Sequence, residues 1–401
     1  MMNILYKTLG ILSVVGLLAL YSCNNDEVAP SLYELPVGGA NTPVINSIDP
    51  PNSALAGVTI VTITGENFNP SVNNNFVFFN GQPASILSAS PTELVVIPPV
   101  VISDSVVVKV SSYKSEDFSN TIIYKLEPAV SEYYPFDAEQ NKEFPYGIWA
   151  TNQENVYVSL SGLGIKEIVA GTPTSLVEFA PKGPETFFRA ITLASDNAIY
   201  AVRGGVRGVY KVVANTKPAA FVSSANGISD NVNDVEYDAT RDVIWGGGST
   251  GILYIIKLDK NVKKYNVDGV VNAVRVAKND LFIATTTNDE EIVWKSAIFN
   301  ADSLGAPEQY FNVSTSIDPS LKIADLAVSE DGDLYIGTDQ ASDPIYNVHP
   351  DKSYETLYPG LIDAPVYSFS WGYGDILYVT NIVDGVNKTV LKINMQKQGT
   401  H

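Results

Sequence analysis

The stretch that decides the fold reads GIWATNQENVY and spans residues 147–157, because its pattern returns five more times along the chain. In each copy, an apolar run suited to a strand is followed by a polar turn and by a second run that ends on an aromatic residue. The remaining copies, aligned on that aromatic residue, are AITLASDNAIY (190–200), DVEYDATRDVIW (234–245), AVRVAKNDLF (273–282), DLAVSEDGDLY (325–335) and SFSWGYGDILY (368–378). The aromatic anchors lie 43, 45, 37, 53 and 43 residues apart, so each period has room for four short strands.

Repeats of this length that carry strands and no helical period are typical of a β-propeller. A single blade cannot bury both of its faces, so the ring must close on itself. The sixth copy ends after its third strand near Met395, whereas the strand-like piece Glu132–Phe136 belongs to no copy. We therefore predict a six-bladed propeller over residues 128–398, in which Tyr133 and Phe136 lie on a strand paired to Thr389–Met395. The spacing and the Asp-Gly turns resemble six-bladed propellers of the NHL and YWTD-like kind, a resemblance that implies a shape more than an activity.

A second all-β segment precedes the propeller. Apolar and polar residues alternate from Val58 to Ile63, as expected for a half-buried strand, and further strand-like runs follow. Its motifs are Ile48-Asp-Pro50, Ile63-Thr-Gly65 with Asn67-Phe68, Asn80-Gly81, Pro98-Pro99 and Ser119-Asn120. With these motifs, residues 42–127 closely resemble the IPT/TIG domain, an immunoglobulin-like sandwich. The resemblance implies a spacer or pairing module that holds the propeller away from a membrane.

The N-terminus has the pattern of a bacterial lipoprotein signal peptide over residues 1–22. Lys7 precedes an apolar run from Leu9 to Leu20, which is too short to span a bilayer as a stable helix. Cys23, the only cysteine, follows this run and resembles the acylated residue of a lipoprotein. The acidic pair Asp26-Glu27 resembles the surface-export signal of Bacteroidota lipoproteins, which implies an outer-membrane protein facing outward. Residues 23–41 then form an acylated tether.

Composition narrows the classes of function. The 401 residues are 45% apolar and only 17% charged, which suits folded domains with sizeable cores. The formal net charge of −19, with no run of Lys or Arg, argues against a partner rich in phosphate, so we predict no binding of nucleic acid.

Sequence motifs for catalysis or for metal binding lack their structural context. The GGGSTG segment at 246–251 matches two Gly-rich motifs, but the strand-like run that follows makes it a hairpin loop. Only two histidines exist, His349 and the terminal His401, so no histidine-based triad or zinc site can be assembled. Asp331-Gly332-Asp333 is expected to be a hairpin turn, because the other ligands of a calcium loop are missing. We predict no metal, no cofactor and no catalytic residue.

The candidate binding site is the mouth of the propeller, where the innermost strand of each blade begins. Counting back from the anchors places one ring of residues there: Tyr146, Arg189, Asn233, Asp234, Asn272, Asp325 and Tyr367. Aromatic faces with amides, an arginine and carboxylates could stack on a sugar and form hydrogen bonds with it. The same residues could instead cap turns or plug the channel.

Three hypotheses about function follow. The first is a non-catalytic surface lipoprotein that captures a glycan or similar ligand for uptake, with a TonB-dependent transporter complex as a partner; the resemblance to accessory proteins of Bacteroidota polysaccharide utilisation implies it. The second is a protein-docking scaffold in an outer-membrane complex. The third is a glycoside hydrolase or lyase that uses Asp234 and Asp325 as its paired carboxylates.

Overall fold

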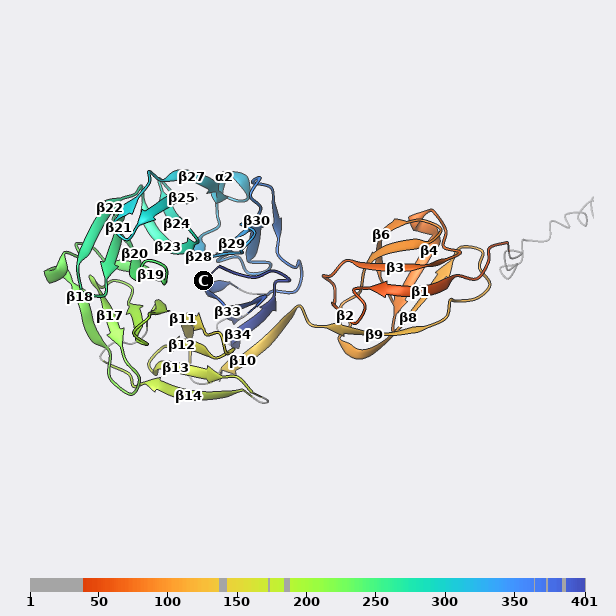
Figure 1. The fold of residues 1–401 in the computed structure, drawn as a ribbon, viewed down its shortest axis with the longest axis horizontal. Helices are drawn as coiled ribbons and strands as arrows, with labels where there is room; N and C mark the ends of the chain where they lie inside the picture. Colours follow the sequence, from red (N-terminus) through yellow and green to blue (C-terminus); the bar gives the residue numbers. More distant parts are fainter. Residues whose placement is uncertain are drawn as a thin grey trace, which may run out of the picture. The chain divides into compact units, whose positions relative to one another are not determined.

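The computed structural model describes residues 39–136, 143–171, 174–183, 188–363, 365–372, 374–383 and 387–400, and it consists almost entirely of strands (Figure 1). Two compact units are present. The first ends at Leu126, and the second runs from Glu127 onward and also includes Leu55–Val58. The expected signal peptide, Cys23, nearly all of the tether and His401 lie outside the described residues. In the described part of the chain, no helix combines the length and the apolar character needed to cross a bilayer.

The first unit is a sandwich of two antiparallel sheets. One sheet has the order β1 (Val44–Asp49), β3 (Val61–Glu66), β7 (Glu93–Ile97) and β6 (Ser85–Ala89). The other has the order β2 (Ser53–Leu55), β9 (Ile122–Glu127), β8 (Ser103–Ser112), β4 (Asn75–Phe79) and β5 (Gln82–Pro83), and the short 3₁₀ helix η1 (Val72–Asn74) precedes β4. This is the immunoglobulin-like arrangement that the sequence predicts.

The sequence motifs of this unit have visible structural roles. Asn80 and Gly81 both have positive φ, 49° and 82°, which is the backbone of the tight turn between β4 and β5. The Asn120 side chain accepts from the backbone nitrogen of Ile45 at 2.8 Å and donates to its oxygen at 2.9 Å. A Cβ atom on Gly65 would lie only 2.0 Å from the carbonyl oxygen of Val44, so the close pairing of β1 with β3 requires glycine there.

The second unit is a six-bladed β-propeller in the residues that the structure describes. Blade one consists of β11 (Pro145–Ala150), β12 (Val156–Leu160), β13 (Gly164–Val169) and β14 (Ser175–Ala180). Blade two consists of β15 (Ala190–Leu193), β16 (Ile199–Val202), β17 (Gly208–Val212) and β18 (Ala219–Ser223). Blade three consists of β19 (Val232–Asp238), β20 (Val243–Gly248), β21 (Ile252–Lys257) and β22 (Val262–Asn266). The 3₁₀ helix η2 (Ser224–Asn226) follows β18.

The remaining blades complete the ring seen in Figure 1. Blade four consists of β23 (Val270–Ala277), β24 (Asp280–Thr287) and β25 (Glu290–Asn300), with β26 (Ser303–Leu304) and β27 (Glu308–Asn312) both paired to β25. Blade five consists of β28 (Ile323–Val328), β29 (Leu334–Thr338), β30 (Ile345–Val348) and β31 (Tyr354–Thr356). Blade six consists of β32 (Val366–Trp371), β33 (Ile376–Val383) and β34 (Asn387–Asn394), with β10 (Val130–Phe136) outermost. The extra strand of blade four and the helix α2 (Val313–Ser316) explain the 53-residue spacing between the fourth and fifth anchors.

The aromatic anchors lie on the second strands and fill the spaces between blades. Tyr200, Trp245 and Tyr378 are fully buried, at 0% exposure each. Trp245 belongs to a cluster with Val271 and Val274 of the next blade, so the repeated aromatic residue packs one blade against its neighbour. Truncating a buried ring of this size typically costs about 3–5 kcal/mol.

The ring closes through β10, the strand that belongs to none of the six sequence copies. β10 pairs antiparallel with β34, with Val130 opposite Ile393 and Pro135 opposite Thr389, which confirms the expected pairing. Tyr378 of blade six joins the same apolar cluster as Ile148 of blade one, so the last blade packs against the first. The outer edge of β34 is thus paired, and β10 is the edge strand of a four-stranded blade.

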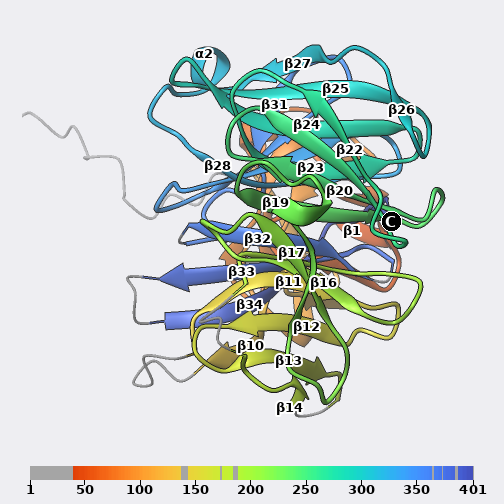
Figure 2. The same ribbon diagram turned by 90° about the vertical axis from the view of Figure 1, so that its left-hand side faces the viewer.

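The C-terminal end of the chain enters the ring. Figures 1 and 2 show the end of the chain at the centre of the blades, toward one face of the propeller. Thr400 donates from its backbone nitrogen to Val328 at 2.9 Å, and Gly399 bridges to Ser329 on the turn after β28. The tail therefore covers one end of the central channel, and the expected mouth lies at the other end of the inner strands.

Candidate functional site

The seven residues expected at the mouth all lie at or just before the starts of the inner strands β11, β15, β19, β23, β28 and β32. The inner strands run in the same direction around the channel, so their starts lie at one end. The structure separates these residues into three groups that differ in burial and in partners.

Two tyrosines form the first group, together with an arginine. Tyr146 of blade one and Tyr367 of blade six meet edge to face, with ring centroids 6.1 Å apart and planes at 78°. Tyr367 is 43% exposed, and burial together with Tyr367 raises the pKa of Tyr146. Arg189 on the neighbouring blade two is exposed, and its backbone nitrogen donates to Val202 at 2.8 Å. These three side chains leave aromatic and guanidinium surface facing solvent.

Two asparagines form the second group and connect strands. The side chain of Asn233 is buried and donates to the carbonyl oxygen of Val271 on the next blade at 2.9 Å. Asn272 donates to the Thr286 hydroxyl at 2.8 Å. Their amide groups are thus used within the protein, as expected if they serve the fold.

Asp234 and Asp325 form the third group and lie on either side of Arg275. Arg275 Nη1 donates to Asp234 Oδ2 at 2.7 Å, and Nη2 forms an ion pair with Asp325 Oδ1. The side chain of Arg275 is only 12% exposed, that of Asp234 6% and that of Asp325 4%. Strand β23 of blade four thus inserts a cation between the inner strands of blades three and five.

Backbone nitrogens also donate to both carboxylates. Asp234 Oδ2 accepts from the backbone nitrogen of Val274 at 2.8 Å, and Asp325 Oδ2 accepts from that of Phe369 at 2.7 Å. Each aspartate therefore fastens its own blade to the inner strand of the next. A buried carboxylate with such partners is held in one geometry by charge-assisted hydrogen bonds.

A fourth charged residue, Glu236, faces this ion cluster from β19. Burial raises the pKa of Glu236 to about 8 against the opposing influence of Arg275, and Asp234 and Asp325 raise it further. Burial alone lowers the pKa of Arg275, but the surrounding carboxylates outweigh it and the net direction is upward. Glu236 and Arg275 line a small cavity of about 40 Å³ together with Trp149, Trp371 and Thr400.

The ion cluster limits the chemistry available in the channel. A hydrolase needs one carboxyl group free to donate a proton and another free to attack or to activate water. Both carboxylates instead bind Arg275 and backbone nitrogens, and each oxygen of Asp325 has such a partner. Within the described ranges, no three His, Cys, Asp or Glu side chains come together in a way that could hold a metal ion.

Arg275 and Glu236 were not among the residues expected from the sequence. Glu236 lies two residues after Asp234 on β19, and Arg275 lies two residues after Ala273, the neighbour of Asn272 on β23. Side chains two apart on a strand face the same side, so counting one further step along each inner strand would have found them.

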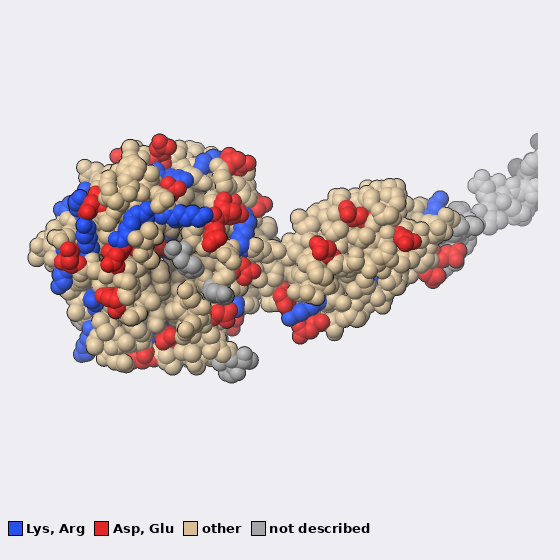
Figure 3. All heavy atoms as spheres, viewed as in Figure 1, with Lys and Arg blue, Asp and Glu red and all other residues tan. Residues whose placement is uncertain are grey.

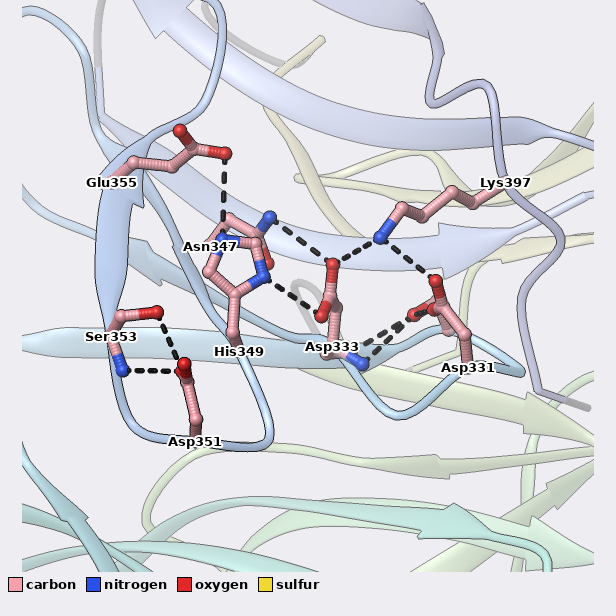
Figure 4. A network of polar contacts seen from close by, with 9 residues as sticks. Asp331, Asp333, Asn347, His349, Asp351, Ser353, Glu355 and Lys397 are labelled. Atoms are coloured by element: carbon pink, nitrogen blue, oxygen red, sulfur yellow. Dashed lines mark hydrogen bonds and ion pairs between the residues drawn. The ribbon is translucent and has the colours of Figure 1, made fainter.

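Two motifs set aside at the sequence level are hairpin turns in the structure. Gly251 has φ of 75° between β20 and β21, and Gly332 has φ of 96° between β28 and β29. The aspartates beside Gly332 bind a lysine of the C-terminal tail: Lys397 lies 2.9 Å from Asp331 and also pairs with the buried Asp333 (Figure 4). His349 Nδ1 lies 3.0 Å from Asp333 on the other side, so this cluster secures the tail across the channel end.

Fold and site together define an IPT/TIG domain followed by a six-bladed β-propeller with an ion cluster at its centre. The IPT/TIG domain family model matches residues 43–124. A search among curated proteins finds no sequence that matches the chain.

Among solved structures, a Bacteroides thetaiotaomicron protein named as a candidate phosphatase is similar with a TM-score of 0.55 and 12% identity, over 88% of this chain and 97% of that one. A gluconolactonase from Xanthomonas campestris is similar over 66% of this chain and 89% of its own, with a TM-score of 0.52 and 12% identity. An auxiliary nutrient binding protein from Bacteroides thetaiotaomicron has a TM-score of 0.49 and 11% identity, over 88% of this chain and 97% of its own. At these identities the likeness concerns the fold alone.

Proposed function

We propose that this chain is a non-catalytic binding protein that captures a glycan or similar ligand at the propeller mouth for an uptake system. One observation carries the proposal: Tyr146 and Tyr367 meet edge to face at the seam between the first and last blades, and Tyr367 is 43% exposed. Rigid aromatic faces at a channel mouth offer contact area to a sugar ring at a low cost in side-chain entropy.

The polar surroundings of the tyrosines support binding over turnover. Arg189 is exposed on the neighbouring blade, where its guanidinium group could orient a hydroxyl or carboxylate group. The acidic pair required by the hydrolase alternative is occupied by Arg275, which favours a structural role for it. The lactonase and phosphatase names attached to similar structures carry no weight against this, since they accompany a shared fold at 12% identity.

The cellular setting is part of the proposal and rests on the sequence. An acylated Cys23 would anchor the chain in the outer membrane, with the acidic residues after it directing it to the outer surface. A TonB-dependent transporter complex is the partner that such a setting implies. The competing scaffold hypothesis places a protein at the same surface instead of a glycan.

Affinity electrophoresis of residues 24–401 through gels containing single polysaccharides tests the proposal. At least one polysaccharide should retard the wild type, and the variant Tyr146→Ala/Tyr367→Ala should migrate unretarded. Lys264→Met, a change on an exposed position of β22, serves as the matched control and should behave as wild type. No retardation by any polysaccharide, together with a stable outer-membrane partner recovered from envelope extracts, would replace glycan capture by the scaffold hypothesis.

A further inference from the structure

A second cavity lies at the opposite end of the inner strands from the mouth. It has a volume of about 550 Å³ and is lined by the turns between β23 and β24, β28 and β29, and β30 and β31, with Thr400 of the tail at one side. Figure 3 shows the molecule in the same view as Figure 1. On this face of the propeller, Lys and Arg side chains form a band beside the centre of the ring. We call this cavity the lysine cleft.

The wall of the lysine cleft contains an aromatic pair. Phe282 of β24 and Tyr310 of β27 meet edge to face, with centroids 5.1 Å apart and planes at 83°. Phe282 is only 3% exposed and packs into the core, whereas Tyr310 is half-buried and presents a ring face to the cleft. The pair is therefore anchored in the core through Phe282.

Two lysines cover this aromatic wall. The ammonium group of Lys352 lies 2.8 Å from the centroid of the Tyr310 ring, and that of Lys295 lies 5.9 Å from it. Lys295 pairs with Asp280 at 2.8 Å, but Lys352 has no carboxylate partner among the described residues. Burial and the charge of Lys295 together lower the pKa of Lys352 to about 8. An anion placed between the two ammonium groups would remove that repulsion.

The position of Lys352 is fixed by its turn. Lys352 has a φ of 74°, and its backbone nitrogen donates to His349 at 2.9 Å. Asp351 accepts from the nitrogen and hydroxyl of Ser353, at 2.9 and 2.6 Å, and these contacts are visible in Figure 4. The turn thus aims the side chain over Tyr310 before any ligand arrives.

Carboxylates complete the lining. Asp280, Glu308, Glu330 and Asp331 border the lysine cleft, and Lys278 donates to the carbonyl oxygen of Glu330 at 2.7 Å. Carboxylates repel a simple anion but accept hydrogen bonds from hydroxyl groups. The cleft therefore fits a ligand that is anionic at one point and rich in hydroxyl groups elsewhere. Negative charges elsewhere on the chain, whose net charge is −19, are largely screened where they lie more than about 8–10 Å from the cleft.

From this lining we infer that the lysine cleft binds a uronic acid residue, with its carboxylate at Lys352 and Lys295, the two lysines held over the Tyr310 ring. The hydroxyl groups then face the acidic rim. This site is separate from the mouth, so it stands or falls independently of the proposed function.

Calorimetry with residues 24–401 and a galacturonic acid trimer tests the inference, with galactotriose as the neutral probe and sodium acetate as the carboxylate alone. The acidic trimer should bind at least tenfold more tightly than either, and Lys352→Met should weaken it about tenfold or more. Lys264→Met should leave it unchanged.

A proton readout separates the cleft from a general charge effect. Pairing with a carboxylate raises the pKa of Lys352, so binding at pH 8 should take up protons, and the heat should change between Tris and phosphate buffers. Lys352→Met should abolish that difference. Acetate binding as tightly as the trimer, no binding of the trimer at all, or unaltered binding by Lys352→Met would each overturn the inference.

Discussion

Replacing Arg275 with methionine tests whether the central carboxylates serve the fold. Methionine keeps most of the length of the side chain but leaves Asp234 and Asp325, at 6% and 4% exposure, without their cation. Removing one partner of a buried ion cluster destabilises a protein by about 3–5 kcal/mol. For a propeller of about 270 residues, this corresponds to a fall in the melting temperature of about 5–9 °C at pH 7.

The size of the loss should depend on pH in a defined direction. Burial already raises the folded-state pKa of Asp325 to about 6, and Arg275 is the charge that opposes this rise. Without Arg275 the folded state binds more protons, so the loss grows as pH rises. Protonating a carboxyl group of pKa about 4 costs about 4 kcal/mol at pH 7 but only about 1.4 kcal/mol at pH 5. The loss caused by Arg275→Met should therefore shrink to about 1–2 kcal/mol at pH 5.

Urea denaturation of both proteins at pH 7 and pH 5 measures these losses. Lys263→Met is the control, because its pair with Asp302 spans 3.5 Å between half-exposed side chains and should change stability by less than about 0.5 kcal/mol. An Arg275→Met variant as stable as the control at pH 7 would refute the structural reading of the cluster. A loss that grows toward pH 5 would contradict the assignment to Asp234 and Asp325.

Three further predictions follow from the same structure. Glu236→Gln should raise the melting temperature at pH 8.5 and leave it unchanged near pH 4. The reason is that the raised pKa of Glu236 makes the wild type lose stability as pH rises from about 4.5 to 8. Equal melting curves of variant and wild type at both pH values would contradict this. A chain beginning at residue 137 lacks β10 and should aggregate or melt well below one beginning at residue 128, as differential scanning calorimetry would show; equal stability would refute closure by β10. Cys23→Ala should move the protein from the membrane to the soluble fraction on immunoblots of fractionated cells, and its retention in membranes would exclude the acyl anchor.

Much of the fold was predictable because local pattern and global packing agree. The anchors Tyr200 and Trp245 recur where each blade must bury a ring against its neighbour, so the period of the sequence is the period of the structure. The outer strand of blade six was predictable by counting, since the last copy lacks one strand and Glu132–Phe136 supplies one.

The candidate site was predictable in position but not in contacts. Their positions at strand starts place Asp234 and Asp325 near the channel. The two aspartates lie two blades apart, however, and the sequence does not show that Arg275 of the blade between them pairs with both. Such contacts join the inner strands of neighbouring blades, and no local sequence pattern records them. The lysine cleft was missed for a similar reason, because three turns distant in sequence build it together.

The measurement that bears most directly on the account is isothermal titration of a retarding polysaccharide, or its oligosaccharide, into wild type and Tyr146→Ala/Tyr367→Ala. Each aromatic contact is worth about 0.5–1.5 kcal/mol beyond its buried area, so the double variant should bind about tenfold or more weakly, while its melting temperature stays that of wild type. Unchanged affinity in a folded double variant, or steady hydrolysis of the glycan by the wild type, would contradict capture at the propeller mouth.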